Sequence, residues 1–202
     1  MIPPEVMREM YWDAWFPMDE DGNLGFFRSS LRALLPIEGI HVSRSLARTL
    51  RSRKYHYTFN RCLERVVREC AKRPDKWLSE EIILSVIQAE KDGWAFSCEA
   101  WLGDELAGGV YGLLVGASFT AESMFTIHTD AGKCALKTLV DRCRECGCEI
   151  FDCQFINPHT ESLGAYEMSD EDFMNLFCQV RVKSLHTAIV PADQESCQNQ
   201  PH

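Results

Sequence analysis

A glutamate inside an apolar segment is the first feature of this sequence that suggests chemistry. Glu122 lies in Phe119-Thr-Ala-Glu-Ser-Met-Phe125, a segment that we expect to form a central strand. A buried carboxylate is costly unless it is paired, so it usually has a partner or a task. In a regular strand Phe119 and Glu122 point to opposite faces, and both reach one cleft only if a β-bulge intervenes. Glu122 is therefore a candidate site residue.

Two polar residues in a later apolar strand raise the same question. Asp152 and Gln154 alternate with Phe151, Cys153 and Phe155, so both point to one face. An ionised Asp152 that accepts a hydrogen bond from the Gln154 amide would orient this glutamine toward a substrate. A purely structural hydrogen bond explains the pair equally well, and the residues alone leave both interpretations open.

A tryptophan beside a carboxylate marks a third candidate. In the strand expected at residues 94–102, alternation places Ser97, Glu99 and Trp101 on the more polar face. An indole there is a candidate for stacking a base or another ring. Packing at the rim of the core is the alternative, and the residue pattern favours it.

The order of the expected elements predicts an α/β fold. Apolar periods predict a helix, a strand and two further helices up to Gly93, and then an antiparallel meander that includes a hairpin at Gly103-Asp104. A helix at residues 131–146 and a strand at 149–155 follow, with two more helices before residue 177. This order predicts a mixed sheet flanked by helices, and it is similar to that of the acetyltransferase (GNAT-like) superfamily.

The same pattern predicts the organisation of the chain. Residues 1–36 are aromatic and turn-rich and are expected to form a small N-terminal layer. Residues 37–185 are expected to form the main domain, and the polar residues 186–202 a frayed tail. The sequence shows no apolar run long enough to span a bilayer and no signal-peptide core, which predicts a soluble cytosolic protein.

Ten cysteines are many for 202 residues. Without a secretory signal they are expected to be reduced thiols. Cys143, Cys146 and Cys148, with Cys153 five residues on, have the short spacings of thiolate ligands for zinc or an iron–sulfur cluster. No second cysteine pair completes a tetrahedral set, so we expect structural cysteines and no metal.

The charge is unevenly distributed along the chain. The net charge of −9 argues against a nucleic-acid-binding protein overall. Residues 41–73, however, contain ten basic residues against Glu64 and Glu69, a local charge of +8 that leaves −17 for the rest. Such a segment is either a phosphate-binding face or a pair of solvated helices, and charge alone does not decide between them.

Several other chemistries lack their motifs. The sequence contains no GxSxG turn, no P-loop and no paired-histidine metal motif. An acyl-CoA-dependent enzyme of this fold needs a glycine-rich turn whose backbone N–H groups bind the pyrophosphate. The corresponding segment, Thr129-Asp-Ala-Gly-Lys133, has one glycine and places an aspartate where the anion would lie. This disfavours coenzyme A.

Taken together, six blocks of residues resemble the leucyl/phenylalanyl-tRNA–protein transferase family. They keep the family's order and spacing between about Phe26 and Phe177, which covers most of the chain. The blocks are His41-Val-Ser-Arg-Ser-Leu46, Glu99-Ala-Trp101, Leu106-Ala-Gly-Gly-Val-Tyr-Gly112, Glu122-Ser-Met-Phe125, Asp152-Cys-Gln154 and His159-Thr-Glu-Ser-Leu-Gly-Ala165.

The resemblance implies a reaction. The ester that links Leu or Phe to the 3′-adenosine of a tRNA is attacked by the α-amine of a protein that begins with Arg or Lys, and the product is marked for degradation through the N-degron pathway. No cofactor is expected because the ester is already activated. The enzyme is expected to act as a monomer on two partners, the aminoacyl-tRNA and the acceptor protein. An acyl-CoA N-acyltransferase and a non-catalytic tRNA- or degron-binding module are the alternatives.

The resemblance also implies roles for particular residues. Asp152 is expected to orient Gln154, which bonds the attacking amine or the reacting carbonyl, and Glu122 to hold the ribose or amine end. Phe27 is expected to bind substrate, and it belongs to a Phe-Phe pair where the family usually has two tryptophans, which leaves the choice of transferred residue open among Leu, Phe and Met. The remaining expected contacts are Trp101 for the terminal adenine, Val110, Phe119 and Met124 for the amino-acid pocket, and Arg44, Arg48, Arg51, Arg53 and Lys54 for tRNA phosphates.

Overall fold

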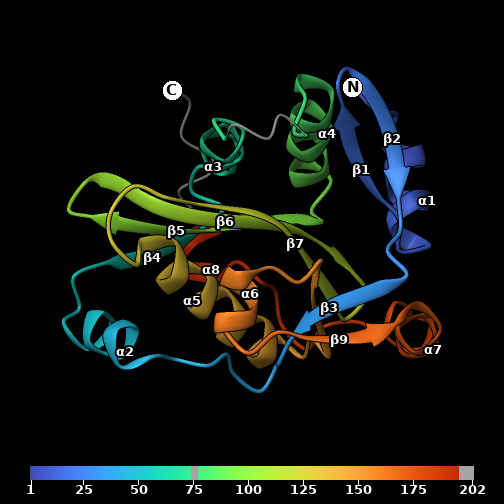
Figure 1. The fold of residues 1–202 in the computed structure, drawn as a ribbon. Coiled ribbons are helices and arrows are strands. Elements are labelled where there is room, and N and C mark those ends of the chain that lie inside the picture. Colours follow the sequence, from blue (N-terminus) through green and yellow to red (C-terminus); the bar gives the residue numbers. More distant parts are fainter. Residues whose placement is uncertain (74–76, 196–202) are drawn as a thin grey trace.

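A seven-stranded mixed sheet forms the centre of the fold. The computed structural model describes residues 1–73 and 77–195. The strand order in the sheet is β4-β5-β6-β7-β8-β3-β9, and only β7 and β8 run parallel among neighbours (Figure 1). The strands are β3 (Leu31–Leu35), β4 (His56–Phe59), β5 (Ala95–Leu102), β6 (Glu105–Val115), β7 (Ser118–Thr126), β8 (Ile150–Gln154) and β9 (Tyr166–Ser169).

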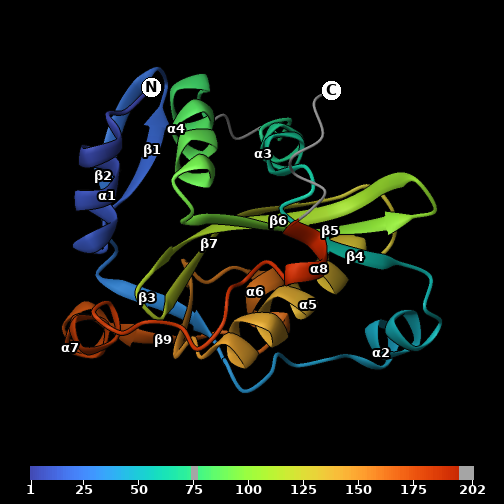
Figure 2. The same cartoon turned by 180° about the vertical axis from the view of Figure 1, so that it is seen from behind.

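Helices cover both faces of this sheet, which confirms the expected mixed α/β architecture. α3 and α4 lie on one face, and α5 and α6 lie on the other, as the two opposite views show (Figures 1 and 2). α2 lies on the α5 side, and α7 lies beside β3 and β9. The helices are α1 (Pro4–Trp12), α2 (Arg44–Arg51), α3 (Leu63–Cys70), α4 (Glu80–Lys91), α5 (Ala131–Cys146), α6 (Pro158–Ser162), α7 (Asp170–Val180) and α8 (Ala192–Glu195).

The N-terminal layer is smaller than expected. It consists of α1 and a separate two-stranded hairpin, β1 (Phe16–Glu20) and β2 (Asn23–Phe27). β3, which we assigned to this layer by drawing its boundary at residue 36, pairs with β8 and β9 in the main sheet. The reason is the apolar composition of β3, which is buried from its second residue to its last.

The C-terminal segment is packed rather than frayed as far as residue 195. Ile189 is 1% exposed and Val190 is 8% exposed. The Arg142 side chain donates to the Ile189 carbonyl at 2.9 Å, and the Phe59 N–H donates to Gln194 Oε1 at 2.8 Å. The two apolar side chains are the physical reason that this otherwise polar segment stays on the body. Residues 196–202, which also fell in the expected tail, lie outside the described residues.

α5 lies unusually close to the sheet. It runs over 16 residues, as expected, and ends at Gly147 in the left-handed region (φ +96°). A Cβ at Gly108 of β6 would lie 2.6 Å from the Gly132 nitrogen in the first turn of α5. Only glycine at position 108 permits this approach. The N-terminus of α5 is therefore pressed against β6.

A β-bulge interrupts the pairing of β6 with β7. Tyr111 pairs with Ser123, and Gly112 pairs with Ala121, so Glu122 is the extra residue on β7. The sequence required such a bulge if Phe119 and Glu122 were to reach one cleft. The bulge is present, and it redirects Glu122.

The sheet opens next to this bulge. β7 and β8 pair from Ser118↔Ile150 to Thr120↔Asp152 and no further. Beyond that point β8 continues to pair only with β3, up to Gln154. After Thr120 on β7 and Asp152 on β8, the two strands no longer pair with each other. This opening positions the candidate site.

Candidate active site

A carboxylate–amide pair bridges the opening between β7 and β8. The Gln154 Nε2 donates to Glu122 Oε1 at 3.0 Å. The Tyr11 hydroxyl of α1 is also hydrogen-bonded to the Glu122 carboxylate. Burial is the main cause that raises the pKa of Glu122 to about 7, and the charge of Asp152 adds to it, whereas the two hydrogen bonds and Arg32 oppose the shift. Near neutral pH, Glu122 is accordingly divided between its acid and carboxylate forms.

A buried ion pair lies beneath this bridge. Arg32 Nε donates to Asp152 Oδ1 at 2.9 Å and Arg32 Nη2 to Asp152 Oδ2 at 2.5 Å, and the two residues are 2% and 0% exposed. The guanidinium lies over the rings of Phe16 and Phe173, 5.0 and 4.9 Å from their centroids. Nη1 donates to the Ala14 carbonyl at 3.1 Å. The pair therefore ties β3 and β8 to the N-terminal layer.

Asp152 fixes Gln154 by a route that differs from our expectation. Its Oδ1 accepts from the backbone N–H of Gln154 at 2.8 Å, whereas the side-chain amide bonds Glu122. The expected bond from the amide to Asp152 is therefore wrong. Gln154 has a φ of +63°, which a non-glycine residue adopts only with support. The bond to Asp152 supplies that support, and the turned backbone directs the amide toward Glu122.

A cavity of about 330 Å³ lies on one side of the bridge. Apolar groups come from β3, β6, β7 and α5, and polar groups come from β7 and from α6 with its cap. Val110 and Met124, both expected in the amino-acid pocket, line this cavity together with Glu122. The other lining residues are Leu35, Arg73, Ala121, Ser123, Leu136, Cys153, Asn157, His159 and Thr160.

A second cavity, of about 250 Å³, meets the first at Glu122. Gln154 lines this second cavity together with Met18, Trp77 and Phe155. Ser123, Cys153, Asn157 and Arg73 line both. The Glu122–Gln154 bridge thus stands where two cavities join, which is the place where two reactants could meet.

Phe119 does not belong to the described walls of either cavity. It is fully buried, and its ring stacks on Phe151 with 5.3 Å between the centroids. At this point β7 still pairs with β8, because the opening begins only after Thr120. Phe119 therefore lies in the layer beneath the described cavities, and its expected role as a wall of the amino-acid pocket stays a prediction.

Trp101 is also remote from the described walls of the two cavities. It is 6% exposed, its Nε1 donates to Thr58 Oγ1 at 2.8 Å, and Arg61 lies over its ring at 4.9 Å. Glu99, which shares its face, is fully buried and accepts from Ser97 Oγ and Thr58 Oγ1 at 2.5 Å each. This face is covered by α3, so it is not the open polar surface that the sequence suggested.

Phe27 lies on the hairpin of the N-terminal layer. It pairs with Phe16 at the base of the hairpin and is half-buried against the core. Within residues 1–73 and 77–195, it is not one of the residues that line the two cavities. The structure therefore brings together Glu122, Val110 and Met124, with Gln154 adjacent, but not the aromatic residues expected beside them.

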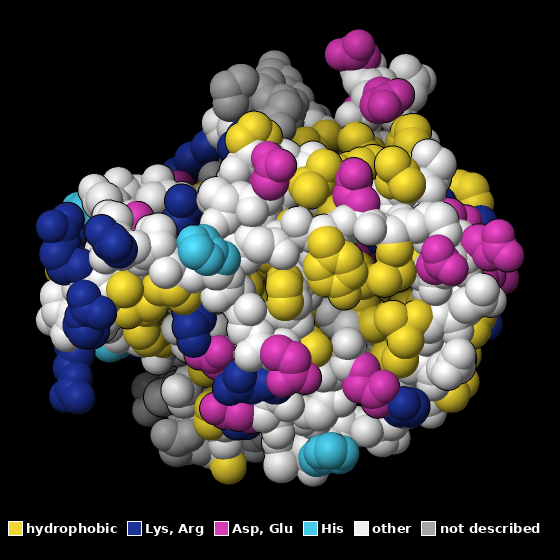
Figure 3. All heavy atoms as spheres, turned by 60° about the horizontal axis from the view of Figure 1, so that its bottom comes forward, with side chains coloured by type: hydrophobic (Ala, Val, Ile, Leu, Met, Phe, Trp, Pro, Cys, Tyr) yellow, Lys and Arg dark blue, Asp and Glu magenta, His cyan; other side chains and the backbone are white. Residues whose placement is uncertain are grey.

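The basic segment divides between two faces. Arg44, Arg48 and Arg51 on α2, with Arg53 and Lys54 after it, are exposed, and Figure 3 shows Lys and Arg side chains gathered at one end of the molecule. The basic residues of α3 lie across the sheet. There, Arg68 pairs with Glu64 and Glu80, at 2.8 and 3.1 Å. The five residues around α2 therefore form one exposed basic surface, and the exposed basic residues of α3 lie on the opposite face of the sheet, where Arg68 is paired with acidic residues.

The cysteine cluster is part of the core. Cys143, Cys146 and Cys148 are buried, and Cys146 Sγ donates to the Ala188 carbonyl at 3.3 Å. Burial raises the pKa of Cys143, and a hydrogen bond with Cys148 adds to the shift. Among the residues that the structure describes, no group of three or more His, Cys, Asp or Glu side chains could hold a metal ion. The described helices include none long and apolar enough to cross a membrane.

Sequence reasoning missed two contributors to the site. Arg32 had a visible signal, since it is a charged residue inside the apolar run Leu31-Arg-Ala-Leu-Leu35. Tyr11 had none, because a tyrosine on an amphipathic helix reads as core. It is 3% exposed, and burial, together with the nearby Glu122 carboxylate, raises its pKa well above the usual value.

The fold and the site define an α/β protein in which a partly buried carboxylate–amide pair stands where two cavities meet, a suitable arrangement for an enzyme that joins two substrates. The family model "Leucyl/phenylalanyl-tRNA protein transferase" matches residues 34–178. The chain belongs to this family and is therefore an aminoacyltransferase. Members of the family act on aminoacyl-tRNA and protein, as the family's name states. This confirms the resemblance of the six blocks.

Individual relatives agree with this assignment. The chain is 43% identical to the leucyl/phenylalanyl-tRNA–protein transferase of Rubrobacter xylanophilus, over 86% of this chain and 92% of the relative. It is 41% identical to that of Novosphingobium aromaticivorans, over 89% and 71% of the two chains. It is 40% identical to that of Ruegeria pomeroyi, over 85% and 83%.

Proposed function

We propose that this chain transfers Leu or Phe from its tRNA to the α-amine of proteins that begin with Arg or Lys, and that the products enter the N-degron pathway. The observation that carries the proposal is the junction of two cavities at the Glu122–Gln154 bridge. One cavity has apolar walls suited to the transferred side chain. The other approaches the same bridge and can admit the attacking amine.

The reaction needs positioning and the transfer of one proton. The amine nitrogen attacks the ester carbonyl, the new C–N bond forms, the bond to the 3′-oxygen breaks, and the proton lost by the amine ends on that oxygen. An α-amine has a pKa of about 7.7–8.0, so a sizeable fraction is already neutral at neutral pH. Holding the two reactants in contact is therefore the larger part of catalysis.

Gln154 and Glu122 have distinct parts in this proposal. The Gln154 amide has no useful pKa, so it acts by hydrogen bonding, and its Oε1 can accept from the attacking amine while its Nε2 bonds Glu122. Glu122 carries negative charge in part of the population because its pKa is about 7. It attracts the cationic or polar end of a reactant. Asp152 and Arg32 hold Gln154 in place without touching substrate.

The apolar cavity is proposed to select the transferred amino acid. Val110, Met124, Leu35 and Leu136 form its apolar wall, and its volume of about 330 Å³ accommodates a Leu, Phe or Met side chain. Burying such a side chain contributes roughly 1.5–3 kcal/mol, which distinguishes apolar from polar aminoacyl groups. Discrimination among the three apolar candidates depends on the fit to Val110 and Met124.

The exposed basic residues around α2 are proposed to bind tRNA phosphates. Five cationic side chains on one surface supply affinity without reading sequence. Trp101 remains the proposed contact for the terminal adenosine, and Phe27 remains a proposed substrate-binding residue. For Trp101, stacking requires Arg61 to leave the face of the indole that it now covers.

The fold supports a further proposal, that the chain is GNAT-like. The antiparallel meander β4–β7, the parallel neighbour β8 and the opening between β7 and β8 agree with that architecture. Coenzyme A is nevertheless a poor substrate for this chain. The first turn of α5 presses on Gly108, and Asp130 precedes it with its carboxylate bonded to Thr49 Oγ1 at 2.8 Å. A pyrophosphate would meet a negative charge there.

One assay tests the proposal. Labelled Leu-, Phe- and Met-tRNA are each offered to the protein with peptides that begin with Arg, Lys, Asp or Glu. We expect transfer from Leu- and Phe-tRNA to Arg- and Lys-first peptides without any added cofactor. We also propose that the protein acts as a monomer and is located in the cytosol. Transfer to none of the peptides, or micromolar binding of acetyl-CoA, would overturn the proposal.

A further inference from the structure

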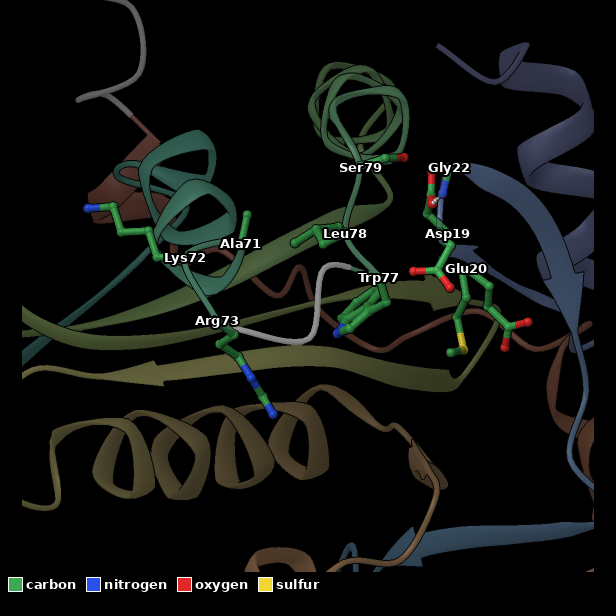
Figure 4. A pocket seen from close by; sticks show the side chains of 11 residues that line it. Asp19, Glu20, Gly22, Ala71, Lys72, Arg73, Trp77, Leu78 and Ser79 are labelled. Atoms are coloured by element: carbon green, nitrogen blue, oxygen red, sulfur yellow. Dashed lines mark hydrogen bonds between the residues drawn. The ribbon is translucent and has the colours of Figure 1, made fainter.

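A third hollow lies between the N-terminal hairpin and the segment after α3 (Figure 4). This groove has a volume of about 920 Å³. The turn of the β1–β2 hairpin forms one wall, and the end of α3 forms the other, with Trp77 between them. The described lining residues are Met18, Asp19, Glu20, Asp21, Gly22, Ala71, Lys72, Arg73, Trp77, Leu78 and Ser79.

The groove is continuous with the candidate active site. Met18, Trp77 and Arg73 line both the groove and the 250 Å³ cavity that contains Gln154. The 330 Å³ cavity lies on the other side of the Glu122–Gln154 bridge. The 330 Å³ cavity, the 250 Å³ cavity and the groove therefore follow one another, and the Glu122–Gln154 bridge lies between the two cavities. A polypeptide whose α-amine reaches Gln154 can leave the site along this path.

The hairpin wall of the groove is negatively charged. Asp19, Glu20 and Asp21 are consecutive at the end of β1, and the groove walls include all three. The hairpin is anchored next to the indole, because the Asp19 N–H donates to the Trp77 carbonyl at 2.9 Å. On the opposite wall, Lys72 pairs with Glu69 at 2.8 Å, and the side chain of Arg73, the second cation there, points away from Trp77 (Figure 4).

We propose that this groove binds the cationic side chain of the acceptor's first residue, with Trp77 under the cation and the Asp19, Glu20 and Asp21 carboxylates around it. The inference rests on the proposed function and adds to it the site that selects the acceptor. A guanidinium or ammonium is attracted both by an indole face and by carboxylates. A tRNA backbone is a poor occupant, since its phosphates would be repelled by the hairpin.

The test replaces the three carboxylates by their neutral isosteres, Asp19→Asn, Glu20→Gln and Asp21→Asn together. The Asn at position 19 keeps an oxygen for the Gly22 N–H that now bonds Asp19 Oδ1 at 2.6 Å. The matched control, Glu38→Gln, Asp104→Asn and Glu145→Gln, changes the net charge equally at exposed residues outside the described groove walls. Folding of both proteins is checked by thermal unfolding.

Acceptor peptides that differ only in their first residue, arginine or its neutral isostere citrulline, are compared at saturating Phe-tRNA. We expect the groove variant to lower kcat/KM for the Arg-first peptide about three- to tenfold, through KM, as expected for losing a few partly exposed ion pairs. Its KM for Phe-tRNA and its rate with the citrulline peptide should stay close to those of the unaltered protein and the control.

A charge reversal gives an independent readout if the triple variant folds poorly. Glu20→Lys should also reduce transfer to the Arg-first peptide and diminish discrimination against a Glu-first peptide. An unchanged ratio of Arg-first to citrulline-first transfer in the folded groove variant would overturn the assignment of the groove. An equal effect of the control would do the same. If the unaltered protein transfers Phe to no peptide, the proposed function fails, and the groove assignment with it.

Discussion

Gln154 and Glu122 are hydrogen-bonded at 3.0 Å across two strands that have stopped pairing with each other. A bulge turns Glu122 out of β7, and a left-handed backbone turns Gln154 out of β8. The left-handed backbone of Gln154 is supported by its bond to Asp152, which is itself held by the buried ion pair with Arg32. Departures of this kind are costly and often mark functional sites.

The pH dependence of transfer should report on Glu122. Because its pKa is about 7, raising the pH through 7 converts it to the carboxylate. The acceptor amine deprotonates in both the unaltered protein and Glu122→Gln, but only the unaltered protein also gains the Glu122 carboxylate. We therefore expect kcat/KM for an Arg-first peptide to rise more steeply with pH in the unaltered protein. The measured quantity is the ratio of the two kcat/KM values from pH 6 to 9. A ratio independent of pH would mean that the ionised form has no role.

Equilibrium unfolding supplies the control for that experiment. Folded Glu122 holds its proton more tightly than an ordinary glutamate near 4.5, because burial raises its pKa to about 7. Its contribution to stability is thus fully present below pH 4.5 and is lost as the pH rises through 7. The stability of Glu122→Gln relative to the unaltered protein should increase over this range in urea unfolding.

The buried ion pair should matter more for stability than for chemistry. Asp152→Asn keeps an oxygen that can accept the Gln154 N–H, but it leaves the 2%-exposed Arg32 without a charge partner. We expect a loss of roughly 3–5 kcal/mol in the free energy of unfolding, as for other broken buried pairs. The double variant Arg32→Met, Asp152→Asn should recover part of it. If the double variant is no more stable than Asp152→Asn alone, the pair does not act through its charge.

The sequence predicted part of this site, and the difference has a physical cause. Glu122, Asp152 and Gln154 could be recognised because a polar residue inside an apolar strand is conspicuous in its local sequence. Their true partners could not be recognised. Arg32 is 120 residues from Asp152, and Tyr11 comes from a helix outside the segment that matches the family model. Alternation also placed Trp101 on a polar face, but α3 covers that face and buries it.

Binding of tRNA should weaken with salt through the surface around α2. Neutralising Arg51, Arg53 and Lys54 to Gln should make the slope of log affinity against log salt shallower by about 2–3. The reason is that fewer counterions are released when fewer phosphate contacts form. The control is Arg65→Gln, Arg68→Gln and Lys91→Gln, which removes the same charge on the opposite face of the sheet. Equal slopes for the two triple variants would place the tRNA elsewhere.

Trp101 can be tested with two substitutions of similar bulk. If the indole stacks on the terminal adenine, Trp101→Leu should weaken binding of aminoacyl-tRNA by about 1–3 kcal/mol, whereas Trp101→Phe should retain most of the affinity. Both variants lose the bond from Nε1 to Thr58, so that loss cancels in the comparison. The difference between the two must disappear on a tRNA that lacks its 3′-adenosine. A difference that persists there, or the absence of any difference, would assign Trp101 to the core alone.

The choice of amino acid should depend on Val110. This residue lies on β6 and lines the 330 Å³ cavity, where the larger of the two proposed side chains needs the most room. Val110→Leu adds one methylene group to that wall, and a change of this size is worth roughly 1–3 kcal/mol in a hydrophobic pocket. We expect kcat/KM for Phe-tRNA to fall at least about tenfold relative to Leu-tRNA.

Val115→Ile, on the same strand but outside the described cavity walls, is the matched control. Competition between labelled Leu- and Phe-tRNA for one Arg-first peptide measures the ratio directly. If Val110→Leu slows both substrates equally while the protein remains folded, the transferred side chain does not lie against β6, and the apolar cavity has another occupant.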